Sequence, residues 1–208
     1  MTPHVAAIVE RIRAAEQEFH QDLVDQAERW RFRLHRRSAR FPADVRDKQR
    51  AFKASLWSFL MAARPLPLLT APVIYSLFVP LAVLDVWMTF YQVVCFPVYG
   101  IPKVRRRDYF VIDHQRLAYL NTIEKVHCMY CGYANGLIAY VREIAARTEQ
   151  YWCPIKHAVP IAAPHARYHL FVDYGDAEGY RRELPSLRQS FLGTRLDQPP
   201  APGPMRRE

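Results

Sequence analysis

Apolar side chains recur at helical spacing along the first forty residues. They stand three or four positions apart, or at multiples of these, which is typical of one face of a helix. Thr2 and Pro3 provide an N-cap and a first-turn residue. The pattern predicts one long amphipathic helix over residues 3–37 that packs on other helices or on a protein partner, with this apolar face: Val5, Ile8, Ile12, Ala15, Phe19, Leu23, Trp30 and Leu34.

A second amphipathic helix is predicted over residues 43–63, after Phe41 and Pro42. Ten Lys and Arg residues but only two acidic residues, Asp44 and Asp47, occur between Arg29 and Lys53. This composition favours an interfacial helix on anionic lipid, and a solvated charged face is the alternative. The apolar stripe of this helix comprises Val45, Gln49, Phe52, Leu56, Phe59 and Ala63.

Residues 66–101 contain no Lys, Arg, Glu or His, and Asp85 is their only formal charge. A helix of this length exceeds the hydrocarbon core, which is about 30 Å thick. Two membrane arrangements fit: a single span near Val73–Val94, or a tight hairpin with its tip at Pro80 to Asp85. Basic residues on both flanks favour the hairpin, and a buried core helix is the third possibility.

The rest of the chain is predicted to be helical and rich in Cys and His, with a short strand over Arg167–Tyr174 and a helix after Gly175-Asp176. The proline-rich end, from Gln198, is predicted to be disordered. We therefore expect a mainly α fold with long amphipathic N-terminal helices, a membrane hairpin or single span, and a helical Cys/His-rich region. The predicted boundaries are 1–64, 65–102, 103–190 and 191–208.

Two short motifs carry the candidate chemistry. Cys128 and Cys131 form Cys-x-x-Cys, and Cys153 and His157 form Cys-x-x-x-His. Thiolates and imidazole suit zinc or iron, and four such ligands complete a tetrahedron. The first-choice prediction is thus a metal site on these four residues, while packing cysteines and metal-free thiol redox chemistry remain alternatives.

The spacing of the two motifs conflicts with a shared ion. If one helix joined Cys131 to Cys153, 22 residues at about 1.5 Å each would separate them by about 33 Å. A helical hairpin turning at Asn135-Gly136 would instead split the ligands between two places. The second-choice ligands for that arrangement are Glu124, His127, Glu143 and His114.

These motifs resemble an uncharacterised family of bacterial membrane-associated proteins. The shared segments begin at His127, reading His-Cys-x-Tyr-Cys-Gly-Tyr-Ala-Asn-Gly, and at Glu149, reading Glu-Gln-Tyr-Trp-Cys-Pro-Ile-Lys-His. The resemblance covers residues 108–160, about a quarter of the chain. It implies a membrane setting and no particular activity.

Composition narrows the class of protein further. The 208 residues carry a net charge of +9, with 7 Gly and 16 Pro. No apolar h-region occurs in residues 1–40, so we expect the inner membrane, with the bulk of the chain in the cytoplasm. The basic residues lie beside an apolar run and not on a stacking platform, so we expect membrane lipid and no nucleic acid as the partner.

Three functions follow as hypotheses. The first is a membrane-bound metal-binding protein with structural zinc or redox iron. The second is an oxidoreductase that uses thiols or a carboxylate-bound metal. The third is a membrane scaffold that binds a protein through its N-terminal helix and whose cysteines only pack. No Walker loop, GxGxxG, GxSxG or HExxH motif supports nucleotide use or the common hydrolases.

Overall fold

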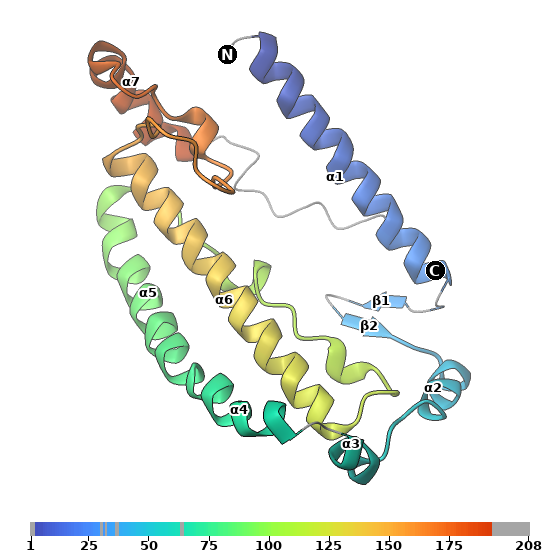
Figure 1. The fold of residues 1–208 in the computed structure, drawn as a ribbon. Coiled ribbons are helices and arrows are strands. Elements are labelled where there is room, and N and C mark those ends of the chain that lie inside the picture. Colours follow the sequence, from blue (N-terminus) through green and yellow to red (C-terminus); the bar gives the residue numbers. More distant parts are fainter. Residues whose placement is uncertain (1–2, 30, 32, 36–37, 63–64, 193–208) are drawn as a thin grey trace. The chain divides into compact units, whose positions relative to one another are not determined.

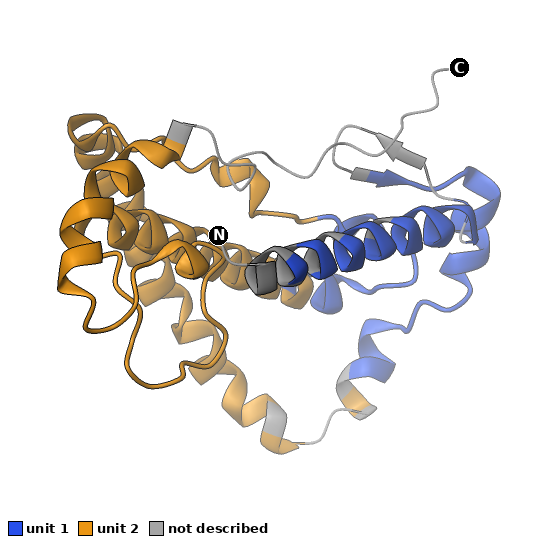
Figure 2. Ribbon diagram, turned by 90° about the horizontal axis from the view of Figure 1, so that it is seen from above, with its two compact units in different colours: residues 1–60, 113–126, 202–208 blue, residues 61–112, 127–201 orange. Residues whose placement is uncertain are grey.

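A computed structural model describes residues 3–29, 31, 33–35, 38–62 and 65–192. The fold is mainly α, as predicted (Figure 1). The chain divides into two compact units, which are coloured in Figure 2: residues 1–60, 113–126 and 202–208, and residues 61–112 and 127–201. The predicted disordered end, from Gln198, lies outside the described residues.

The first unit begins with α1, Pro3–Arg29, which ends earlier than the predicted helix. Strands β1, Arg33–His35, and β2, Ser38–Arg40, follow and pair antiparallel. The prediction of helix was wrong at Arg33–His35, because apolar and basic residues alternate from Trp30 to His35, while residues 36–37 lie outside the described residues. A period of two belongs to a strand.

The predicted helix over residues 43–63 is two helices, α2 at Ala43–Arg50 and α3 at Leu56–Ala62. Ser55 separates them, and its side-chain oxygen accepts a hydrogen bond of 3.1 Å from the Ser58 backbone N–H. Serine at such a position is a helix start signal, so one continuous helix was wrong here. The short helix η2, His114–Arg116, completes this unit with the first residues of α6.

Helices α4, Pro65–Ser76, and α5, Phe78–Tyr99, form a nearly continuous rod. Its stretch Leu68–Tyr99, 32 residues, is long and apolar enough to cross a membrane. The predicted hairpin tip at Pro80 to Asp85 was wrong. Pro80 occupies the first turn of α5, where a missing N–H costs no helical hydrogen bond.

The rod ends at Gly100, whose φ of 70° is the left-handed conformation that favours glycine. The Ile101 N–H then bonds the Phe96 carbonyl at 2.9 Å, and this closes the helix end. The chain turns back at this point as an irregular segment that contains η1, Arg106–Asp108.

Helix α6, Thr122–Trp152, is a single helix of 31 residues. The predicted hairpin at Asn135-Gly136 was wrong, because both residues serve the continuous helix. The Asn135 side chain donates to the Cys131 carbonyl at 2.9 Å. Gly136 lies where the returning segment crosses α6, and a Cβ there would be 2.8 Å from the Tyr109 carbonyl oxygen.

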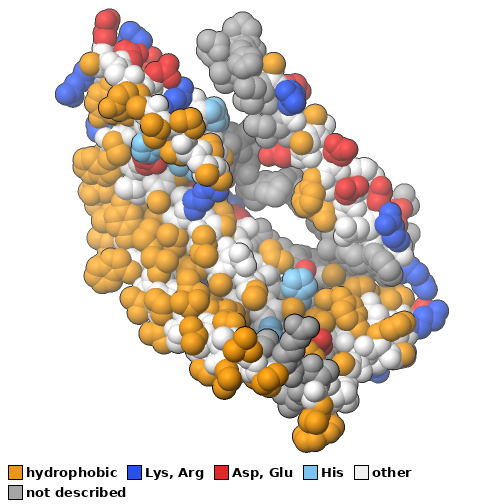
Figure 3. All heavy atoms as spheres, in the orientation of Figure 1, with side chains coloured by type: hydrophobic (Ala, Val, Ile, Leu, Met, Phe, Trp, Pro, Cys, Tyr) orange, Lys and Arg blue, Asp and Glu red, His pale blue; other side chains and the backbone are white. Residues whose placement is uncertain are grey.

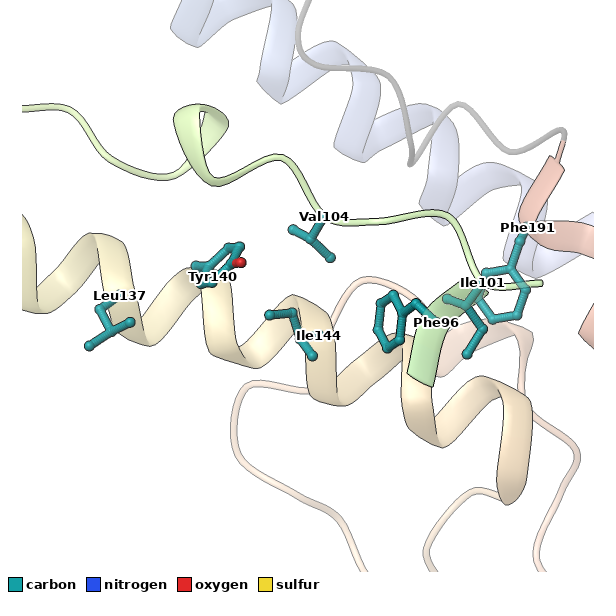
Figure 4. Close-up of a cluster of buried hydrophobic side chains, with 7 residues drawn as sticks. All are labelled: Phe96, Ile101, Val104, Leu137, Tyr140, Ile144 and Phe191. Atoms are coloured by element: carbon teal, nitrogen blue, oxygen red, sulfur yellow. The ribbon is translucent and has the colours of Figure 1, made fainter. Parts of the chain in front are cut away.

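The C-terminal part holds η3, Tyr168–Leu170, α7, Ala177–Gln189, and η4, Ser190–Leu192. The predicted strand Arg167–Tyr174 was wrong, since only an isolated bridge joins Ile155 to Val172. The helix predicted after Gly175-Asp176 is α7, which Asp176 caps. The core of the second unit is shown in Figure 4 and comprises Phe96, Ile101, Val104, Leu137, Tyr140, Ile144 and Phe191.

Candidate membrane-binding site

One face of α5 exposes apolar side chains along the whole length of the helix. On α5 these recur every three or four residues, which keeps them on one side of the helix. Hydrophobic side chains gather over this part of the molecule in Figure 3. The exposed stripe, here called the outer face, comprises Val79, Val83, Val86, Trp87, Phe90, Val94 and Val98, each between 48% and 77% exposed.

The opposite face of α5 carries its polar residues, and they are buried. Asp85 pairs with Arg106 and accepts a hydrogen bond from the Tyr133 hydroxyl at 2.9 Å. Gln92 bonds the Tyr140 hydroxyl through its side-chain nitrogen. The hydrogen bond to Asp85 raises the pKa of Arg106, so its guanidinium remains charged.

Helix α6 runs parallel to the rod and covers this polar face. The Tyr130 hydroxyl donates to the Ile74 carbonyl at 2.8 Å, near the junction of α4 and α5. At the other end of α5, the Tyr99 ring stacks on Tyr151 with 5.2 Å between ring centroids. Because these contacts lie near the two ends of α5, α6 accompanies α5 over nearly its full length.

The segment after Gly100 also lies against α5. The Val104 N–H donates to the Gln92 side-chain oxygen at 3.0 Å, and Arg106 reaches Asp85. Asp85 is near the middle of Leu68–Tyr99. The segment from Val104 to Arg106 is therefore level with the part of the rod from Gln92 back to Asp85, not beyond its end.

A buried ionic cluster joins α6 to the C-terminal part. The Glu143 carboxylate accepts hydrogen bonds from Arg147 at 2.8 Å and from Arg167 at 2.9 Å. Arg167 is fully buried and also donates to the Gln150 side-chain oxygen at 3.0 Å. Two buried guanidinium groups thus share the Glu143 carboxylate, which is one of several partners of each.

The first-choice metal ligands do not meet within the chain. Cys128 and Cys131 lie one turn apart on α6, Cys128 half-buried and Cys131 exposed, and both are free thiols. Because α6 is unbroken, about 33 Å of helix separates Cys131 from Cys153. No group of three or more His, Cys, Asp or Glu side chains in the described part of the chain could hold a metal ion.

Cys153 and His157 lie just past the end of α6, and both are exposed. Partial burial of the sulfur, and then the nearby Glu149 carboxylate, raise the pKa of the Cys153 thiol. A raised pKa favours the neutral thiol, which is a weaker metal ligand than the thiolate. The His157 ring stacks on Tyr168, with 6.1 Å between ring centroids.

The second-choice ligands are also dispersed. Glu124 forms a capping box with Asn121, accepting its backbone N–H at 2.7 Å. His127 lies against the Tyr75 ring, and about 24 Å of helix separates it from Glu143. His114 is an exposed residue of η2.

Sequence reasoning missed the polar partners of α5. Asp85, Thr89 and Gln92 stand four and three residues apart, which marks one polar stripe on an otherwise apolar helix. From that spacing alone, a face of the helix covered by protein could have been predicted. The sequence did not indicate that Arg106 and Tyr133 would be the partners on that face. Comparison of the chain with protein-family models, with curated proteins and with solved structures finds no match.

Proposed function

We propose that the protein is a monotopic membrane protein that acts as a helical scaffold. In this proposal α4 and α5 lie along the bilayer surface with the outer face in the lipid, and α6 lies on their water-facing side. The position of Arg106 beside Asp85, near the middle of Leu68–Tyr99, is the observation that carries the proposal.

A transverse span would bring several charges to membrane depth. Lys103, Arg105 and Arg107 are exposed and lie on the same returning segment as Arg106. An Arg or Lys at the centre of a bilayer costs at least about 2.5–3.5 kcal/mol. An in-plane helix avoids this cost, because one face contacts lipid while the other faces water.

The charge pattern supports the cytoplasmic leaflet of the inner membrane as the location. In the sequence, basic residues precede and follow the apolar rod, at Lys53 and at Lys103–Arg107. Anionic headgroups attract such residues with about 1 kcal/mol each. Helix α1 adds a surface for a protein partner, since Phe19 and Leu23 on it are exposed.

Flotation of the purified protein with vesicles tests the proposal. After removal of detergent, we expect the protein to float with neutral phosphatidylcholine vesicles, because the outer face provides apolar burial without charge. Protein that stays at the bottom of the gradient as a soluble species contradicts membrane docking.

Metal binding at Cys128 and Cys131 is the second candidate function. Two free thiols one turn apart can supply two ligands to one zinc or iron ion. In the described residues no further ligand stands beside them, so a second copy of the chain would have to complete a four-thiolate site. Thiol redox chemistry at the same pair is the enzymatic alternative.

Metal content in two single variants separates these thiols. We expect Cys128→Ser to remove most of the bound metal and Cys153→Ser to leave it unchanged, because Cys153 lies about 33 Å of helix from Cys131. Elemental analysis of the detergent-purified protein measures both. Equal loss in the two variants would mean that the four residues share an ion, and no metal in the parent protein would exclude this candidate.

A further inference from the structure

The first unit contains a cleft lined almost entirely by cations. Its volume is about 450 Å³, which is within the usual range of small-molecule sites, about 300–1,000 Å³. Among the described residues that line it, there is no Asp or Glu. The lining residues are Arg46, Arg50, Lys53, Arg116, Ala118 and Lys125.

Three segments far apart in the sequence provide these side chains. Arg46 and Arg50 are four residues apart and so lie on one face of α2. Arg116 ends η2, and Lys125 lies in the first turns of α6. The Gln49 side-chain oxygen accepts a hydrogen bond of 3.4 Å from the Ala118 backbone N–H, which joins α2 to the η2 segment.

Charge is poorly compensated inside this cleft. Of these five cations, only Arg50 forms an ion pair within the described part of the chain, with Asp47 at 3.0 Å, and that pair is exposed to solvent. Exposed pairs contribute little, about 0–1 kcal/mol. Five like charges facing one space repel one another, and a bound anion would relieve that repulsion.

From this arrangement we infer that the cleft is a binding site for a phosphate ester carrying at least two negative charges. Arginine pairs with phosphate through two parallel N–H bonds, and the cleft presents three arginines and two lysines. The cleft is separate from the outer face of α5, so phosphate binding in the cleft does not depend on membrane docking by the rod. The same chemistry is offered by the headgroup of an anionic lipid and by a soluble phosphate compound.

The first arm of the test uses lipid. The full-length protein is bound to phosphatidylcholine vesicles with and without phosphatidylglycerol. We expect Arg50→Gln with Arg116→Gln to reduce the preference for the anionic vesicles at least about tenfold. Binding to the neutral vesicles should stay unchanged, and it reports separately on the outer face.

The second arm uses a soluble probe, inorganic pyrophosphate, titrated by calorimetry into the protein in detergent. The matched control for both arms is Arg40→Gln with Lys48→Gln, which removes two exposed charges of the same unit that do not line the cleft. Neither double variant should lower the thermal midpoint, because each removes like charge without emptying a core position.

The outcomes assign the ligand or reject the site. Loss of pyrophosphate binding in the cleft variant alone identifies a soluble phosphate ligand. Loss of anionic-lipid preference in that variant, with no pyrophosphate binding by the parent protein, identifies a lipid headgroup. The proposed phosphate site is rejected if both variants weaken binding equally, or if the parent protein binds neither probe. It is also rejected if a single-stranded RNA binds more tightly than pyrophosphate.

Discussion

Replacement of Val83 and Phe90 by lysine is expected to weaken binding to neutral phosphatidylcholine vesicles at least about 100-fold. Both side chains belong to the outer face and are 62% and 57% exposed. Each substitution removes about 1 kcal/mol of apolar burial in lipid and adds a charge that resists entry. Together these effects amount to about 3 kcal/mol or more, which is a factor of about 100 in affinity.

A matched pair of substitutions tests whether the position of the added charge matters. Val159 and Tyr174 are 68% and 69% exposed, and neither lies on the rod. Val159→Lys with Tyr174→Lys therefore adds the same charge at sites that the proposal keeps in water. Flotation should separate the two double variants. Equal detachment of both would show that the outer face has no special role in docking.

Glu143→Gln is expected to lower the free energy of unfolding by about 3 kcal/mol. Removing one partner of a buried ion pair costs about 3–5 kcal/mol, because the remaining charge stays buried without compensation. Here the change removes one ion pair from each of Arg147 and Arg167, which keep their other hydrogen bonds. Glutamine keeps the shape and one acceptor oxygen, so we expect the lower end of that range.

Urea unfolding in a mild detergent, followed by circular dichroism, measures this effect. The control is Glu183→Gln, which removes a carboxylate that pairs with Arg182 at 3.0 Å on the surface. That variant should change stability by less than about 0.5 kcal/mol. Similar values for the two variants would show that the buried cluster does not stabilise the fold.

Long periodic segments were predictable from the sequence, while their ends depended on local signals. Helix α1, the apolar rod and the helix after Asp176 follow from periodicity and capping. The helix break could have been predicted from Ser55 as an N-cap, and the strand pair from the alternation of apolar and basic residues. The same residues also fit a helical spacing, which favoured the wrong prediction in both places. These boundary errors arose because one stretch of sequence fitted two different patterns of apolar spacing.

The turn predicted at Asn135-Gly136 failed for a different reason. Gly136 serves close packing, since Phe110 and the Tyr109 carbonyl lie within 3.3 Å of where its Cβ would be. A glycine in a helix can mark either a turn or a close approach, and only the tertiary fold distinguishes them. The position of Cys153 depended on the same choice: a continuous helix places it about 33 Å from Cys131, as the structure has it, and a turn would have placed it elsewhere.

Asp85 shows the limit of sequence reasoning most clearly. A carboxylate in an apolar segment suggests either a turn at a hairpin tip or a buried pair, and the choice depends on a partner 21 residues away. The returning segment places Arg106 there, and no local pattern predicts such a return. In the proposed function, the same pair favours an in-plane rod over a transverse one.

Depth measurements along the outer face test the central claim most directly. Spin labels placed one at a time at Val79, Val83, Phe90, Val94 and Val98 report their depth in a bilayer, with the four native cysteines replaced by serine. An in-plane rod predicts similar depths at all five sites, within about 5 Å, near the boundary of headgroups and acyl chains. A transverse rod would instead change depth by about 1.5 Å per residue, or about 28 Å from Val79 to Val98, and that result would contradict the account.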